Sequence, residues 1–409
     1  MLPLLLALTL ATPQSEDPVA AWTEDTLLFL EQLERLHPDP WFGCPREDFE
    51  AAVDGFLGGL EGQRESERVA GFLRLVARLA EQGRDGHSLA WPMTSRTLPL
   101  QVYGFADGWF VVGAPQAERV GARLVSVGGV PVEEACGRLA PLLTADNEWN
   151  RREKLALALV TLDLLDGVGL AESPERARVV LEQAGTRTET LLEGEPADPH
   201  RMWGRPVLPA RGGAAWLEGR ERFFAWQVLE PERALYVQFN EVRAQDARGR
   251  TLEDHAREMV ATFEQRGLTR LVLDVRLNGG GDNTTFGPLI AALQHPSLAR
   301  PGVLYGLIGR STFSAAGNFA AALGQDTQAL LVGEPTGGAP NQYGDARDVR
   351  LPNHPALLVR LSTRYHQFGP ADDARLAVEP DLGVPLTSGD YFAGRDPVLR
   401  AALEHVPPR

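Results

Sequence analysis

The sequence contains ALYVQF at 234–239, RLVLDV at 270–275, VLYGLIG at 303–309 and ALLVG at 329–333, four short apolar segments typical of β-strands. The intervals between them carry apolar residues at helical spacing, over 251–266, after Thr284 and after Ser314. Strands that alternate with helices favour a sheet covered by helices. This stretch therefore predicts a layered α/β core, and we assign residues 226–409 to it.

A helical region precedes this core near the start of the chain. Between residues 23 and 80 apolar residues recur at spacings of three and four, with Pro- and Gly-containing breaks that separate three helices. The last predicted helix ends in the polar loop 83–88. We therefore expect a helical N-terminal domain at 15–95.

Residues 96–225 have a different pattern, with short β-rich runs, a helical stretch near 151–165 and a Pro- and Gly-containing linker from 193 onward. Within this region, ARLVSVGGVPVEEACGRLAPLL (122–143) has the order strand, Gly-Gly turn, Pro and helix. That order resembles the carboxylate-loop half of a peptide-binding PDZ domain. We expect a small, partly PDZ-like β-rich domain with a helical insert.

Composition excludes several classes of protein and of partner. The net charge is −15, so the chain lacks the basic surface that neutralises phosphates, which argues against nucleic acid or an anionic lipid surface as partner. Lysine-dependent chemistry has one candidate, Lys154, since every other Lys or Arg position is arginine. Cys44 and Cys136 are too few for a disulfide scaffold or a Cys-x-x-Cys site, and whether they pair is open.

The first residues form the apolar run LPLLLALTLA (2–11), which is too short to span a bilayer. Residues 1–14 predict a signal peptide, and hence a secreted or periplasmic (cell-envelope) protein. No basic residue precedes the run, so a disordered or helical start of a cytoplasmic protein is the alternative. No later stretch is long and apolar enough to cross a membrane.

Two connections in the α/β region have the pattern of reactive loops. Asn278 and three glycines follow the strand at 270–275, where bare backbone N–H groups suit an oxyanion, although a tight turn is the simpler explanation. The spacing fits no phosphate-binding motif. Ser314, in STFSAAGN (311–318), lies between a strand and a helix, where it is either a nucleophile or an N-cap.

These loops belong to an ordered set of motifs. The set consists of Asp85-Gly86-His87, LVLDVRLNGGG (271–281), STFSAAGNFAAAL (311–323), LVGEPTGGAPNQYGD (331–345) and LAVEPDLGVPL (376–386). Together they resemble the tail-specific, or C-terminal-processing, serine proteases, a family that includes tricorn protease and the repeats of interphotoreceptor retinoid-binding protein. The resemblance implies a ββα-spiral (ClpP/crotonase-like) α/β protease core preceded by the helical cap and the β-rich domain.

The resemblance also implies roles for individual residues. The nucleophile falls on Ser314, and the oxyanion donors fall on the N–H groups of Ala315 and of Gly280 or Gly281. The bacterial branch has a lysine base where this chain has Ala339, so a serine–lysine pair is not expected. The tricorn-like branch uses a histidine from the segment that His87 matches.

The remaining candidates for the site are less specific. His366 is the rival base, and Lys154 has no motif that supports a catalytic role. A histidine base needs an acceptor on its second ring nitrogen, and Asp372 or Asp373 would supply it unless the two are simply solvated. An imidazole base predicts activity that rises between about pH 5.5 and 8.

The sequence therefore predicts a secreted serine-type peptidase that acts on a peptide or protein substrate, with no cofactor and no metal. The alternative is a non-catalytic binding module of the same fold, for apolar ligands or C-terminal peptides. The substrate sequence and the oligomeric state do not follow from the sequence.

Overall fold

The computed structural model describes residues 15–197, 208 and 215–407. The expected signal peptide at 1–14 and part of the expected linker lie outside these residues. The C-terminal half of the fold is built on a six-stranded sheet of order β10-β11-β12-β13-β14-β19. In this sheet β10 is antiparallel to β11, and the other neighbouring strands are parallel. These strands are β10 (Phe224–Leu229), β11 (Ala234–Phe239), β12 (Arg270–Asp274), β13 (Leu304–Ile308), β14 (Leu330–Gly333) and β19 (Leu382–Gly383).

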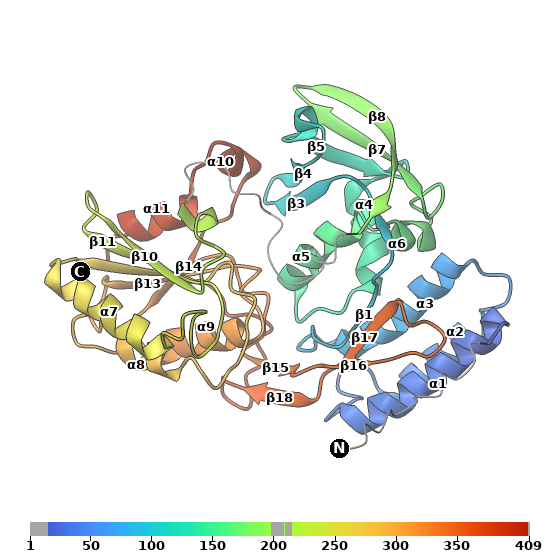
Figure 1. The fold of residues 1–409 in the computed structure, drawn as a ribbon, viewed down its shortest axis with the longest axis horizontal. Helices are drawn as coiled ribbons and strands as arrows, with labels where there is room; N and C mark the ends of the chain where they lie inside the picture. The colour runs from blue at the N-terminus through green and yellow to red at the C-terminus, as the bar shows by residue number, and fades with distance from the viewer. Residues whose placement is uncertain (1–14, 198–207, 209–214, 408–409) are drawn as a thin grey trace, which may run out of the picture.

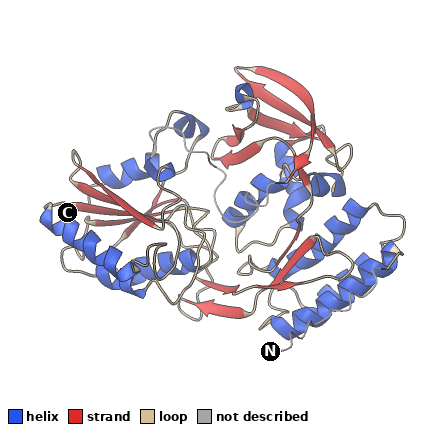
Figure 2. Ribbon diagram, in the orientation of Figure 1, coloured by secondary structure: helices blue, strands red, loops and turns tan. Residues whose placement is uncertain are grey.

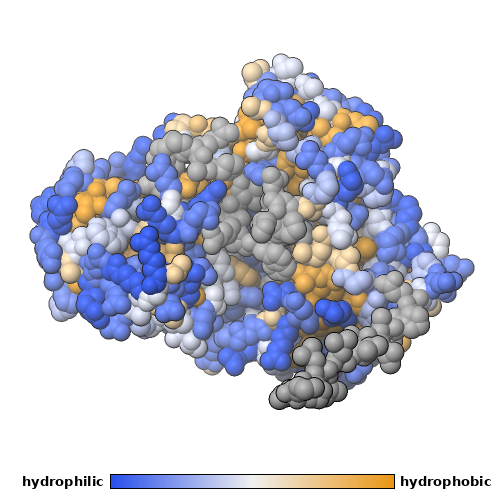
Figure 3. All heavy atoms as spheres, viewed as in Figure 1, coloured by the Kyte–Doolittle hydropathy of each residue, from blue (hydrophilic) through white to orange (hydrophobic). Residues whose placement is uncertain are grey.

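Helices cover both faces of this sheet, as Figures 1 and 2 show. One face packs against α7 (Leu252–Gln265), α8 (Gly287–Leu293) and α9 (Ala315–Asp326), and the other against α10 (Ser388–Phe392) and α11 (Pro397–Glu404). Every residue of β11 is buried, as expected for a strand with both faces covered. The α/β core predicted from the sequence is confirmed, and hydrophilic side chains cover its outer surface near α7 (Figure 3).

The three helices predicted near the N-terminus are present as α1 (Pro18–Leu36), α2 (Arg46–Gly58) and α3 (Glu65–Ala77). Asp17 caps α1 by accepting a hydrogen bond from the Val19 N–H. Trp22, on α1, is fully buried against the ring of Phe72 on α3, so the helices share an apolar core.

The β-rich region forms a second sheet of order β3-β4-β5-β7-β8, with β6 paired to β5 (Figure 1). The helical stretch predicted near 151–165 is two helices, because the chain turns after Ala158. The PDZ likeness stays a prediction. The elements are β3 (Gln101–Phe105), β4 (Gly108–Gly113), β5 (Arg123–Val127), β6 (Val130–Pro131), α4 (Val132–Leu139), α5 (Glu148–Ala158), α6 (Leu162–Gly167), β7 (Arg176–Gln183) and β8 (Thr186–Glu193).

Packing crosses the domain boundaries expected from the sequence. The N-terminal helices and the second sheet share one hydrophobic cluster, which also contains Val349, Val359 and Leu361 from the C-terminal half. Short strand pairs make the connections, so chain segments far apart in sequence support one another. The pairs are β1 (Leu89–Pro92) with β17 (Leu357–Leu361), β17 with β16 (Arg347–Val349), β15 (Asn341–Gly344) with β18 (Arg364–Gln367), and β2 (Arg96–Thr97) with β9 (Glu195–Pro196).

The structure also bears on the two cysteines and on membrane spans. Cys44 and Cys136 are both buried and both free, so they do not pair. Among the helices of the described residues, none has the length and apolarity needed to cross a bilayer.

Candidate active site

Ser314 occupies the turn between β13 and α9 with an unusual backbone conformation. Its φ of 54° and ψ of −131° lie in a backbone region that residues other than glycine rarely adopt. It stands at the N-cap position of α9, yet its side chain makes no capping hydrogen bond. The N-cap explanation therefore does not account for this serine, and its hydroxyl is free to contact another group.

That other group is His87, which lies in the loop between α3 and β1. Its Nε2 atom lies 2.8 Å from Ser314 Oγ, and its ring stacks on Phe313 with 4.6 Å between the ring centroids. Ser314 comes from the α/β core and His87 from the N-terminal half, so the contact forms where the two halves meet.

Burial makes His87 a neutral imidazole near pH 7. Desolvation lowers the pKa of His87 to about 4, against the opposing attraction of Asp85, and Lys154 lowers it further. A neutral ring can accept a proton from Ser314 Oγ. The second nitrogen, Nδ1, is buried and has no hydrogen-bond partner among the described residues.

The carboxylates expected to orient His87 are elsewhere. Asp373 binds Arg375, with 2.7 Å between Oδ2 and Nη2, and Asp372 is exposed. Neither accepts a hydrogen bond from the ring, so the structure does not bring either carboxylate to His87. Their loop follows Pro370, where Arg375 is close enough in sequence to neutralise the nearer carboxylate.

The glycine loop lies against the serine. A Cβ on Gly280, whose φ is +111°, would come within 2.6 Å of Ser314 Cβ, so only glycine fits there. The Gly280 N–H already donates to Asn278 Oδ1 at 3.0 Å, which removes it as a free oxyanion donor. Within the described part of the chain, the N–H groups of Gly281 and Ala315 have no acceptor and remain the candidate donors.

His366, the rival base, also lies near the site, but its ring has other contacts. Its Nε2 lies 3.3 Å from Asp345 Oδ1 and its Nδ1 lies 3.3 Å from Asn283 Nδ2. Its ring and that of His87 are both close to Gly344. The hydrogen bond to Ser314 therefore distinguishes His87 from His366.

Two charged residues that the motifs did not single out lie directly behind His87. Lys154 Nζ donates to the carbonyl oxygens of Gly86 at 2.8 Å and Thr144 at 2.7 Å. Asp146 accepts from the Gly86 N–H at 2.5 Å and, through its other oxygen, from the Ala339 N–H at 3.1 Å. Burial lowers the pKa of Lys154 to about 8 and raises the pKa of Asp146 to about 7. The sequence offered one hint, that Lys154 is the only lysine.

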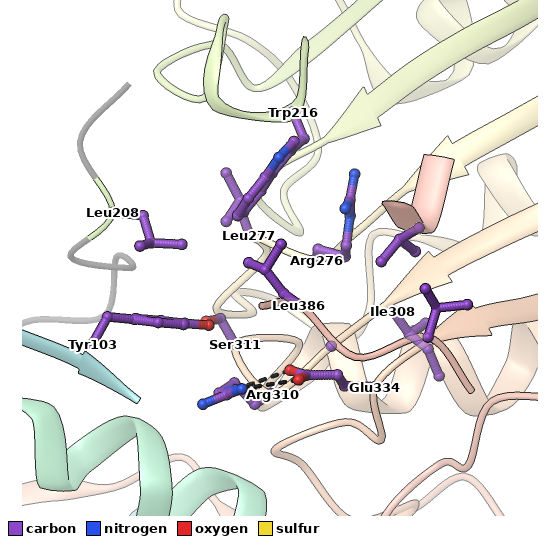
Figure 4. Close-up of a pocket in the computed structure, with 13 residues that line it drawn as sticks. Tyr103, Leu208, Trp216, Arg276, Leu277, Ile308, Arg310, Ser311, Glu334 and Leu386 are labelled. Carbon is purple, nitrogen blue, oxygen red and sulfur yellow. Dashed lines mark hydrogen bonds and ion pairs between the residues drawn. The ribbon is translucent and has the colours of Figure 1, made fainter. Parts of the chain in front are cut away.

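A cavity of about 40 Å³ lies near the nucleophile turn, between β3 and the core sheet. Figure 4 shows Tyr103 and Ser311 on its walls and the ion pair between Arg310 and Glu334. Its volume suits water rather than a substrate side chain. Among the described residues, no group of three His, Cys, Asp or Glu side chains is placed to hold a metal ion.

Comparison with solved structures shows the class of fold: the chain has the fold of the protein CPAF. It is similar to the solved structure of mature CPAF complexed with lactacystin, with a TM-score of 0.63 and 16% identity over 92% of this chain and 96% of that chain. The structure of a CPAF variant matches with a TM-score of 0.62 and 15% identity over 95% and 99% of the two chains.

The likeness to CPAF concerns the fold, because identities this low do not transfer residue roles. The photosystem II D1 C-terminal processing protease matches with a TM-score of 0.40 and 18% identity, over 88% of this chain and 92% of that chain. No protein-family model matches the sequence. No curated protein sequence matches it at a significant level.

Proposed function

We propose that this protein is a serine-type peptidase in which Ser314 is the nucleophile and His87 the general base. The observation that carries the proposal is the 2.8 Å contact between Ser314 Oγ and His87 Nε2, at a turn with a strained backbone. Strain of this kind concentrates at functional sites. A capping serine would not need it.

In the proposed reaction Ser314 Oγ attacks the carbonyl carbon of a peptide bond and gives its proton to His87 Nε2. The developing oxyanion takes hydrogen bonds from the N–H groups of Gly281 and Ala315, and the positive end of α9 adds to this stabilisation. His87 then returns the proton to the leaving amine. Water, activated by the same ring, hydrolyses the acyl-enzyme ester and releases Ser314.

Lysine is not the base in this proposal. Ala339 stands where the bacterial branch of the resembling family has its lysine, as the motif resemblance implies. Lys154 uses its ammonium group to donate to two carbonyl oxygens, and it has no contact with Ser314. A group that acts as donor to two acceptors is poorly suited to take a proton from the hydroxyl.

The alternative, a non-catalytic binding module, predicts a site whose serine and histidine have lost their mutual contact. The retained contact favours the hydrolase. The direct test is incubation of the purified protein with a mixed peptide library, followed by mass spectrometry of the products. We expect new termini with the wild type and none with Ser314→Ala. Equal cleavage by both proteins would show that the activity does not depend on Ser314 and would reject the proposal.

Export remains part of the proposal, on the apolar run at 2–11 alone. Sequencing of the N-terminus of the protein from its native cell should begin after Ala11 or within the next several residues. A mature protein that retains Met1 or Leu2 would reject export and favour a cytoplasmic peptidase.

A further inference from the structure

Two consecutive peptide units next to the proposed base, on either side of the Gly86 Cα, are held by hydrogen bonds to two buried ionisable side chains. The Gly86 carbonyl accepts from Lys154 Nζ at 2.8 Å, and the Gly86 N–H donates to Asp146 Oδ1 at 2.5 Å. Hydrogen bonds that involve a charged group are stronger than neutral ones. Gly86 immediately precedes His87, so these two hydrogen bonds fix the backbone from which the imidazole extends.

The fit around Gly86 leaves little freedom. A Cβ at this position would lie 2.9 Å from Asp146 Oδ1 and 3.0 Å from Asn150 Oδ1. The loop backbone is therefore pressed directly against the polar groups of the segment that leads into α5. Any shift of Asp146 would move Gly86, and with it His87.

The same pair also reaches the segments that hold the nucleophile. Asp146 accepts from the Ala339 N–H at 3.1 Å, and Lys154 Nζ lies 5.8 Å from the centre of the Phe313 ring. Phe313 precedes Ser314 and stacks on His87. Lys154 and Asp146 thus lie against the loop that carries His87, against Phe313 and against the turn at Ala339. The relative position of these segments sets the distance between His87 and Ser314.

We propose that Lys154 and Asp146 are positioning residues that hold His87 in hydrogen-bond contact with Ser314. The inference rests on the proposed function, because it assigns the pair to the base of that reaction. Neither side chain touches the reacting atoms in this proposal. Their effect passes through the backbone at Gly86, and misplacing a base by about 1 Å costs on the order of 100-fold in rate.

The test uses the rate at which a fluorophosphonate modifies the protein, measured over a range of probe concentrations. In Lys154→Met, which keeps the length of the side chain without its charge, the maximal rate should fall on the order of 100-fold. The concentration that gives half of that rate should stay unchanged, because the probe's binding surface is intact. Arg151→Met, a neighbouring cation on α5 without a contact to Gly86, is the matched control and should react like the wild type.

A double-mutant comparison separates positioning from general damage. If Lys154 acts through His87, adding Lys154→Met to His87→Ala should cause little further loss of rate. A further 100-fold loss in that background, or a wild-type rate in Lys154→Met alone, would overturn the inference. Asp146→Asn provides a second variant, since it replaces one of the two accepting oxygens by an NH2 donor that faces the N–H of Gly86 or of Ala339.

An unreactive wild-type protein would reject the proposed function and not the positioning role. In that case crystal structures of the wild type and of Lys154→Met decide the matter. The inference predicts that the 2.8 Å contact between His87 Nε2 and Ser314 Oγ is present in the first and lost in the second. An unchanged contact in the variant would overturn it.

Discussion

The side chains of His87 and Ser314 lie 2.8 Å apart although 227 positions separate them in the sequence. Each sits on an element whose place is set by packing far from the contact: His87 precedes β1, which pairs with β17, and Ser314 begins α9, which packs on the core sheet. A contact of this kind persists only if both halves of the fold keep their relative position. The reactivity of Ser314 is therefore also a readout of that packing.

The pH dependence of the reaction should reflect a buried histidine. Because burial lowers the pKa of His87 to about 4, the base is already neutral at pH 6. We expect protonation of His87 to cause no change in the rate of fluorophosphonate labelling between about pH 6 and 7.5, and to lower that rate near pH 4. This revises the rise between about pH 5.5 and 8 that an ordinary imidazole would give.

The same pKa has a consequence for stability. In the unfolded chain a histidine has a pKa of about 6.5, so between roughly pH 6.5 and 4 the unfolded state binds more protons than the native state. The contribution of His87 to the free energy of unfolding therefore falls as the pH falls through this window. Urea denaturation of the wild type and of His87→Ala at pH 7 and 5 measures it. A larger loss of stability in His87→Ala on acidification would contradict the assigned shift.

The strained backbone of Ser314 predicts a separation of stability from activity. Ser314→Gly and Ser314→Ala both remove the hydroxyl, but glycine adopts a φ of 54° without penalty and alanine does not. We expect the glycine variant to be more stable than the alanine variant by about 1 kcal/mol, with neither reactive. Equal urea midpoints for the two variants would show that the turn stores no strain.

Because the glycine loop lies close to Ser314, a single methyl group added at Gly280 should lower the reactivity of the serine. In Gly280→Ala the new Cβ would displace Ser314, whose own Cβ is 2.6 Å away, and labelling should fall on the order of 100-fold. Gly287→Ala is the control, because a Cβ there meets nothing within 4 Å. A Gly280→Ala protein that reacts at the wild-type rate would contradict the observed geometry. Gly281→Ala is less informative, since its Cβ would collide with the Val242 carbonyl at 2.0 Å.

Much of the fold could be predicted because it is encoded locally. The helix expected at 251–266 is α7, with Thr251 as its N-cap, and the four apolar segments of the core are strands. The pairing of β1 with β17 could not be predicted in this way. The two short strands lie more than 260 positions apart, and nothing in the local sequence of either one specifies the other as its partner. The shared hydrophobic cluster likewise joins segments that the sequence pattern assigns to different domains.

The structure brings together the two candidate site residues that stand in a motif, and it does not bring to them the carboxylates that were chosen by sequence interval alone. Ser314 and His87 each stand in a recognisable loop, and the structure brings them together. Asp373 was selected for its distance in sequence from Ser314, but its carboxylate forms an ion pair with Arg375, two positions later. Lys154 was missed because a lysine on a polar helix usually faces solvent, and its burial depends on the fold around it.

The central claim, that Ser314 is an activated nucleophile, is tested most directly by treating the native protein with a fluorophosphonate and locating the adduct by peptide mass spectrometry. The account predicts one modified residue, Ser314, and loss of the modification in Ser314→Ala while the protein remains folded. It also predicts strong reduction in His87→Ala, because the serine then lacks its base. An unmodified wild-type protein, or an adduct that persists in Ser314→Ala, would contradict the claim.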